Sequence, residues 1–139
     1  HGVMTGQMIE KIEEVIINEK PNWIIVYGDT NSTLAGAIAA SKLNIKIAHV
    51  EAGLRSFNIG MPEEVNRILT DRISSLLFCP TETAINNLSK EGINNWRPKP
   101  KFFLSGDVMK DGELYGYIPS DHVPIAVTLN YSSDTQLDE

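Results

Sequence analysis

The chain has 139 residues, of which 42% are hydrophobic, and this is enough apolar material for one packed domain. Its 18 acidic side chains outnumber 12 lysines and arginines, and the net charge of −6 disfavours nucleic acids and anionic membranes as partners. The single cysteine, Cys79, excludes an intrachain disulfide bond and favours a reducing, cytoplasmic location. No apolar segment approaches the roughly 20 residues that cross a bilayer.

The first part of the chain alternates between helical and strand patterns. Apolar residues at helical spacing from Met8 to Ile16 predict a helix that ends before Pro21. The run Trp23 to Tyr27 is apolar on both faces, as in a central parallel strand that helices cover on both sides. A polar turn at 28–33 then leads into a helix of small residues at 34–40, which predicts a close approach of that helix to its sheet.

The same alternation continues through the middle of the chain. The pattern predicts a strand at 45–50, a helix at 62–75 and a strand at 76–79. The apolar residues of the helix, which we expect to face the core, are Val65, Ile68, Leu69 and Ile73. Thr81 is a suitable N-cap for a further helix, and Gly92 follows the end of that helix.

The last part of the chain is less regular. A strand is predicted at 102–104 and a short helix at 107–115, which Gly112 weakens. A turn-rich segment at 117–122 reads as a linker, and 124–129 offers one more strand. The order of strands and helices predicts an α/β fold with a Rossmann-like parallel sheet, whose ligands bind beyond the carboxyl ends of the strands.

Three carboxylates are the candidates for a site at this edge. Asp29 follows a strand after Gly28, Glu51 directly follows a strand, and Glu63 lies in the first turn of a helix. Several carboxylates in one crevice cannot all ionise freely, so we expect one protonated acid beside one ionised base. Structural explanations stay open, because Asp29 also suits a turn or N-cap, and the helix dipole is a sufficient reason for Glu63.

Two neighbouring residues have a structural and a functional interpretation. Arg67 lies four residues after Glu63 and three after Glu64, a spacing that is typical of a surface ion pair. His49 alternates with inward-facing strand residues, and a hydrogen-bonded core histidine is favoured over a catalytic one. No cysteine–histidine cluster has zinc spacing, and Gly28 to Asn31 matches neither GxGxxG nor a Walker A loop. We therefore predict neither a metal nor a cofactor.

Five segments carry a family resemblance in a fixed order. They are VYGDTNSTLAG at 26–36, HVEAGLRS at 49–56, MPEEVNR at 61–67, FCPTETA at 78–84 and SGDVM at 105–109. Together they resemble the non-hydrolysing UDP-N-acetylglucosamine 2-epimerases over residues 3–115.

The resemblance implies a glycosyltransferase-B type architecture, in which two Rossmann-like domains hold a UDP-sugar between them. By this resemblance, residues 1–117 are a partial first domain that lacks its first strand, and 118–139 are a linker and the start of a truncated second domain. The implied reaction inverts C2 of a UDP-N-acetylhexosamine by eliminating UDP, forming a 2-acetamidoglucal and adding UDP back, without nicotinamide. The product is a precursor of surface polysaccharides, and family members commonly form homodimers.

The resemblance also assigns roles by position. It implies Asp29, Glu51 and Glu63 as catalytic residues and Arg55, Arg67 and Asn130 as substrate-binding residues. The loop residue Arg55 fits a solvated arginine equally well. Asn130 and Tyr131 stand where the family has His and Arg, and this supports an alternative in which a truncated or degenerate member binds a sugar nucleotide, or pairs with another subunit, without catalysis.

Overall fold

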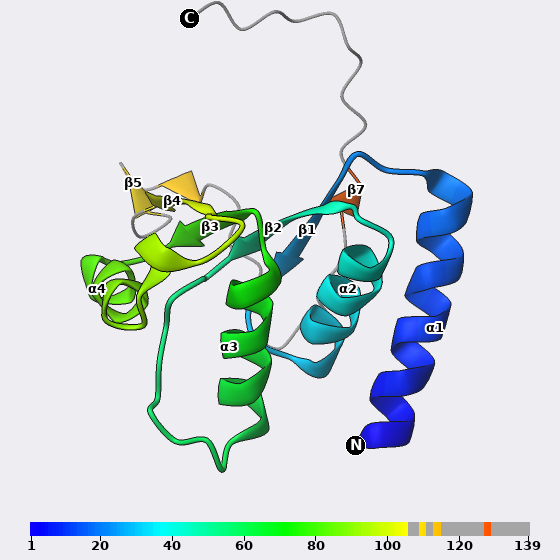
Figure 1. The fold of residues 1–139 in the computed structure, drawn as a ribbon, viewed down its shortest axis with the longest axis horizontal. Coiled ribbons are helices and arrows are strands. Elements are labelled where there is room, and N and C mark those ends of the chain that lie inside the picture. The colour runs from blue at the N-terminus through cyan, green and yellow to red at the C-terminus, as the bar shows by residue number, and fades with distance from the viewer. Residues whose placement is uncertain (106–108, 111–112, 115–126, 129–139) are drawn as a thin grey trace, which may run out of the picture.

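A computed structural model describes residues 1–105, 109–110, 113–114 and 127–128 of the chain (Figure 1). The helices are α1 (Gly2–Glu19), α2 (Asn31–Lys42), α3 (Pro62–Ile73) and α4 (Glu82–Lys90), followed by the 3-10 turn η1 (Ile93–Asn95). The longer strands are β1 (Trp23–Tyr27), β2 (Lys46–Val50), β3 (Leu76–Cys79) and β4 (Lys101–Leu104). The two-residue strands are β5 (Met109–Lys110), β6 (Glu113–Leu114) and β7 (Val127–Thr128).

Strands β4, β3, β2 and β1 lie side by side in this order and are all parallel. The register places Val26 opposite His49 and His49 opposite Leu77, so the carboxyl ends of β1 and β2 meet at one edge of the sheet. On the side of β1 away from β2, the short strand β7 pairs antiparallel with Ile24 and Ile25. The predicted Rossmann-like parallel α/β sheet is confirmed.

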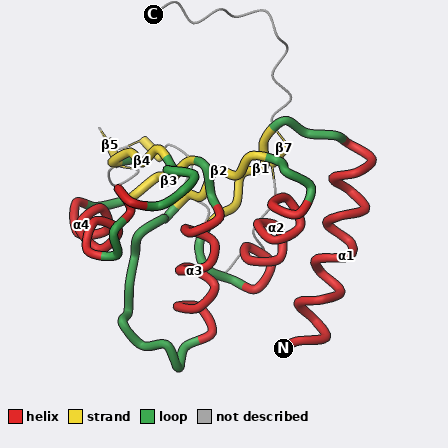
Figure 2. Tube along the Cα trace, viewed as in Figure 1, coloured by secondary structure: helices red, strands yellow, loops and turns green. Residues whose placement is uncertain are grey.

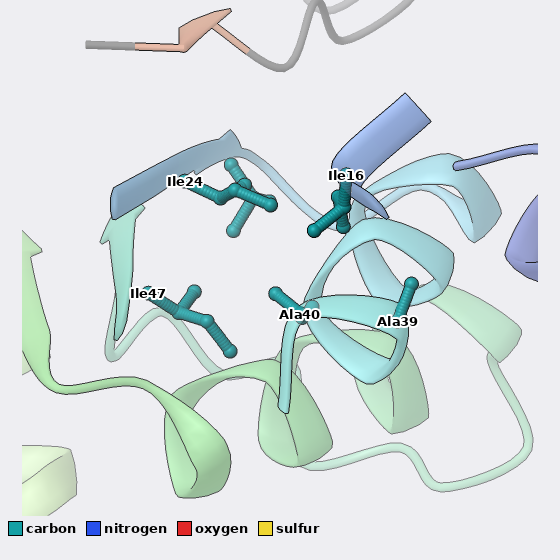
Figure 3. Packing of buried hydrophobic residues seen from close by; sticks show 7 residues of the cluster. Ile16, Ile24, Ala39, Ala40 and Ile47 are labelled. Carbon is teal, nitrogen blue, oxygen red and sulfur yellow. The ribbon is translucent and has the colours of Figure 1, made fainter. Parts of the chain in front are cut away.

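The buried face of the sheet packs against helices, and Figure 2 shows α1, α2 and α3 side by side. A buried cluster joins α1, α2, β1 and β2, and Figure 3 shows how Ile16, Ile24 and Ala40 converge within it. A Cβ atom at Gly36 would lie 3.4 Å from Cγ1 of Val26, which explains why α2 consists of small residues. The predicted close approach of this helix to the sheet is confirmed.

The opposite face of the sheet is only partly covered within the described residues. Along β1, Ile24 and Val26 are buried, whereas Trp23, Ile25 and Tyr27 are only partly buried. The prediction that helices cover β1 on both sides is therefore wrong within the described residues. On this face Phe78 stacks against Phe103, with ring centroids 5.8 Å apart.

Helix α3 faces the protein with its polar side, contrary to prediction. Val65, Leu69 and Ile73 are exposed, with 36%, 45% and 37% of their surface accessible, and Ile68 is half-buried. The residues that α3 buries are Glu64, Asn66, Thr70 and Asp71. The reason is that hydrogen bonds to the segments after β1 and β2, rather than apolar contacts, hold this helix in place.

The carboxyl-terminal part departs from prediction at one point. Residues 109–110 and 113–114 pair as two antiparallel strands, so the predicted helix at 107–115 is wrong at these positions, where Gly112 weakened the helical pattern. Strand β7 falls within the strand predicted at 124–129. The domain boundary after residue 117 stays a prediction. None of the described helices is long and apolar enough to span a membrane.

Candidate functional site

The carboxyl ends of β1 and β2 bring Asp29 and Glu51 to the same edge of the sheet. Gly28 follows β1 with a left-handed φ of 66°, and its backbone N–H donates to the carbonyl of Val50 at 3.1 Å. A Cβ atom at Gly28 would lie 3.6 Å from Oε2 of Glu51, so the Glu51 carboxyl group lies over the turn that carries Asp29.

The backbone of Glu51 is unusual for a non-glycine residue. Its φ is 70°, in the left-handed region that costs a side-chain-bearing residue on the order of 1 kcal/mol or more. Such backbone conformations cluster at functional sites, where the surrounding structure holds them in place.

Two residues of helix α3 bind the turn that carries Asp29. Arg67 forms an ion pair with the Asp29 carboxylate, and Asn66 Nδ2 donates to the Asp29 carbonyl at 2.9 Å and to Asn31 Oδ1 at 3.0 Å. The N-cap of α2 is Thr30, whose side chain accepts from the backbone N–H of Thr33. The carboxylate of Asp29 is therefore free of the capping role that the sequence left open.

The two carboxyl groups differ in their electrostatic surroundings. Burial, and then the neighbouring Asp29, raise the pKa of Glu51 above its ordinary value of 4.5, while His49 and Arg67 act in the opposite direction. Asp29 instead lies in an ion pair with Arg67. Glu51, which retains its proton more readily, thus lies beside the Asp29 carboxylate, which is paired with a cation. Such a pair can carry out acid–base chemistry.

The predicted ion pair at the start of α3 exists, but Arg67 pairs with Glu64 and is not a surface residue. Nη1 of Arg67 lies 2.6 Å from Oε2 of Glu64, whose side chain is only 1% exposed. Glu64 also accepts from the backbone N–H groups of Ser56 and Phe57, at 3.0 and 2.9 Å. Glu63 is exposed and makes no hydrogen bond or ion pair within the described ranges, so its catalytic role stays a prediction.

Arg55 lies in a buried network and is not a solvated loop residue. Its guanidinium is 1% exposed and donates to Asp71 at 2.7 Å and to both carboxylate oxygens of Glu91 at 2.6 and 2.8 Å. A substrate-binding role for Arg55 stays a prediction, and it would require these ion pairs to rearrange. Asn130 lies outside the described residues.

The prediction of a hydrogen-bonded core histidine is confirmed. The His49 side chain is fully buried, and its ring nitrogens lie 2.7 Å from Asp71 Oδ1 and 2.8 Å from the Gly28 carbonyl. Sequence reasoning missed Asn66, Glu64 and Asp71 as residues that shape the site. Asn66 and Glu64 lie in the segment 61–67 that carries the resemblance, whereas Asp71 has no local signal. In the part of the chain that the structure covers, no group of three or more His, Cys, Asp or Glu side chains has metal-binding geometry.

Comparison with protein-family models identifies one match. The model described as UDP-N-acetylglucosamine 2-epimerase matches residues 1–123 of the chain. Two similar curated proteins are the UDP-2,3-diacetamido-2,3-dideoxy-D-glucuronate 2-epimerase of Pseudomonas aeruginosa and a UDP-N-acetylglucosamine 2-epimerase homolog of Methanococcus maripaludis. The first is 62% identical over 115 residues, which are 83% of this chain and 32% of that protein. The second is 63% identical over 114 residues, which are 82% of this chain and 30% of that protein.

A solved structure shares the fold as well as the sequence. The UDP-GlcNAc 2-epimerase of Methanocaldococcus jannaschii in complex with UDP-GlcNAc and UDP superposes with a TM-score of 0.68 at 58% identity, over 75% of this chain and 28% of that one. The chain thus spans about a third of the length of the proteins that it matches.

Proposed function

Because this chain belongs to the UDP-N-acetylglucosamine 2-epimerase family, we propose that it functions as a UDP-N-acetylhexosamine 2-epimerase. The observation that carries the proposal is the pair Asp29 and Glu51 at the carboxyl ends of β1 and β2, with Arg67 beside it. The pair supplies one proton acceptor and one proton donor, which inversion of a carbon centre by removal and return of a proton requires.

The reaction proceeds by elimination and re-addition. One carboxylate takes the proton from C2, the electrons of that C–H bond form a C1–C2 double bond, and the C1–oxygen bond breaks so that UDP leaves with its electron pair. A proton then reaches C2 from the opposite face while UDP adds back to C1. We assign Glu51 as the proton donor, because its raised pKa lets it hold a proton more readily, and Asp29, which is ion-paired with Arg67, as the proton acceptor.

The C2 proton has no carbonyl next to it, so the departing diphosphate needs positive charge and preorganised dipoles. Arg67 is the cation at the carboxylate pair, and its side chain remains 13% exposed. We retain Arg55 and Asn130 as further substrate-binding residues and Glu63 as a third catalytic carboxylate, and these roles rest on the family resemblance.

The substrate is a UDP-N-acetylhexosamine or a modified form of one. One relative is named for UDP-2,3-diacetamido-2,3-dideoxy-D-glucuronate, and others for UDP-N-acetylglucosamine. Both names describe a 2-acetamido sugar on UDP, and this shared part supports the proposed class. We also propose a role in making polysaccharide precursors, a cytoplasmic location and a homodimer, which rest on the family resemblance.

A second candidate is a family member that binds a sugar nucleotide, or pairs with another subunit, without turnover. The observation that favours it is the presence of Asn130 and Tyr131 where the family has His and Arg. Asparagine cannot exchange a proton near neutral pH as histidine can, and tyrosine cannot neutralise a phosphate.

One pair of measurements separates the two candidates. The purified chain is incubated with UDP-N-acetylglucosamine in heavy water, deuterium at C2 is followed by NMR, and UDP binding is measured by calorimetry. Exchange that the Asp29→Asn variant abolishes supports the epimerase. Binding of UDP without exchange supports the second candidate, and the absence of both results refutes the epimerase and the nucleotide-binding form of the second candidate.

A further inference from the structure

A row of four charged side chains lies next to the acidic pair. The members of this row, in order of contact, are His49, Asp71, Arg55 and Glu91, and Glu91 forms its solvent-exposed end. His49 Nδ1 lies 2.7 Å from Asp71 Oδ1, Arg55 Nη1 lies 2.7 Å from Asp71 Oδ2, and Arg55 Nε lies 2.6 Å from Glu91 Oε1. The first three side chains are 0%, 0% and 1% exposed, so water does not compete for the His49–Asp71 and Asp71–Arg55 contacts, whereas Glu91 is 32% exposed.

The contacts of His49 determine how many hydrogens its two ring nitrogens carry. Nε2 lies 2.8 Å from the carbonyl oxygen of Gly28, which can only accept, so Nε2 carries a hydrogen. A second hydrogen must lie between Nδ1 and Asp71 Oδ1, because two lone pairs at 2.7 Å would repel. Oδ2 of Asp71 accepts from the Gly53 backbone N–H at 3.0 Å and from Arg55, and these donors stabilise the carboxylate. The second hydrogen therefore belongs to the ring.

We propose that His49 is a buried imidazolium that fixes the turn before Asp29 and supplies positive charge to the Asp29–Glu51 pair. His49 is thus a positioning residue, since it acts through the two carboxyl groups and is itself enclosed. The importance of those two groups for catalysis rests on the proposed function, whereas the charge of His49 does not.

One hydrogen bond and one electrostatic effect connect His49 to the site. Its Nε2–H donates to Gly28, the residue directly before Asp29, and this bond holds the left-handed turn at the end of β1. Its positive charge also lowers the pKa of Glu51, against burial and Asp29, which raise it. The other charged groups near His49 are Asp71 from α3 and, through it, Arg55. Cys79 on β3 stays a neutral thiol, because burial raises its pKa to about 11.

The first test measures the charge of His49 in the unaltered chain. We expect 15N NMR of histidine-labelled protein to show both ring nitrogens of His49 protonated at neutral pH, because each ring nitrogen faces an acceptor oxygen. A ring nitrogen of His49 with the chemical shift of an unprotonated nitrogen at neutral pH would overturn the proposal. This measurement needs no variant and no turnover.

The second test measures the effect of that charge on Glu51. The His49→Gln variant keeps an amide donor for Gly28 but removes the charge, and the matched Arg72→Gln variant removes an exposed α3 cation that lies over Trp96. By 13C NMR we expect the titration midpoint of Glu51 to rise by about 1 pH unit in His49→Gln and to stay unchanged in Arg72→Gln.

Circular dichroism establishes that each variant is folded. An unchanged Glu51 midpoint in folded His49→Gln would overturn the role of the charge, and if that variant does not fold, the 15N measurement on the unaltered chain still decides the proposal. Failure of deuterium exchange would refute the proposed function and leave both NMR results standing, so the two failures are distinguishable.

Discussion

Replacement of Glu64 by glutamine tests how strongly α3 is bound to the segment after β2. The Glu64 carboxylate is buried and accepts from two backbone N–H groups, those of Ser56 and Phe57, and from Arg67. Glutamine has the same shape but only one acceptor oxygen, so its NH2 group must face a donor. The loss of one charge-assisted hydrogen bond and of the Arg67 pair gives an expected destabilisation of about 3 kcal/mol.

The pH dependence of this effect follows from the pKa of Glu64. Burial raises this pKa, but the hydrogen bonds from Ser56 and Phe57 outweigh burial and lower it below the ordinary value of 4.5. A carboxylate with a lowered pKa in the folded state contributes its stabilisation above pH 4.5 and loses it as the pH falls toward the folded value. The difference between the parent and Glu64→Gln must therefore shrink below this pH.

The assay is urea unfolding of both proteins at neutral pH and across the acidic range. The matched control is Glu63→Gln, because Glu63 is its exposed neighbour without a partner in the described structure, and we expect it to change the free energy of unfolding by less than about 1 kcal/mol. A neutral-pH effect of Glu64→Gln that equals the control, or a difference that does not shrink in acid, would refute the reasoning.

Three further substitutions or reactions test other parts of the fold. A Cβ atom at Gly53 would lie 2.6 Å from the Ala84 carbonyl oxygen, so Gly53→Ala is expected to lower the midpoint of thermal unfolding much more than Gly92→Ala, which has the same φ of 79° but open space. Thr81→Ala removes the N-cap of α4 and is expected to cost about 1 kcal/mol in chemical unfolding. Cys79 is buried with a raised pKa, so a thiol reagent is expected to modify it only as fast as the chain unfolds in urea.

The strands and most helices could be predicted because their signals are local. The apolar run from Trp23 to Tyr27 and the cap residue Thr81 each determine structure within a few positions, and the structure has them where the sequence placed them. The positions of Asp29 and Glu51 also followed from local order, since each lies within two residues of the carboxyl end of its strand and these ends meet at one edge.

The supporting contacts of the site could not be predicted, because they join residues far apart in the chain. His49 and Asp71 are 22 positions apart, and Arg55 and Glu91 are 36 apart. No periodicity or spacing rule connects such positions, and a loop arginine such as Arg55 has the same local pattern whether it is solvated or enclosed.

The sequence pattern predicts the position of helix α3 correctly, but it is wrong about which face of the helix is buried. The hydrophobic period of Val65, Leu69 and Ile73 predicts that these residues face the core, and this rule assumes that burial of apolar surface decides the orientation of a helix. Here polar partners decide it, because Asn66 and Arg67 hold the Asp29 turn.

The inward polar face of α3 also sets a limit on how stable this fold can become. When buried polar residues such as Asn66 and Asp71 are replaced together with their partners by well-packed apolar side chains, the protein is often as stable or more stable. Selection for stability alone would therefore replace these residues and release the Asp29 turn. The helix thus retains the site only while selection acts on function, and thermostabilising designs for this fold need to leave that face unchanged.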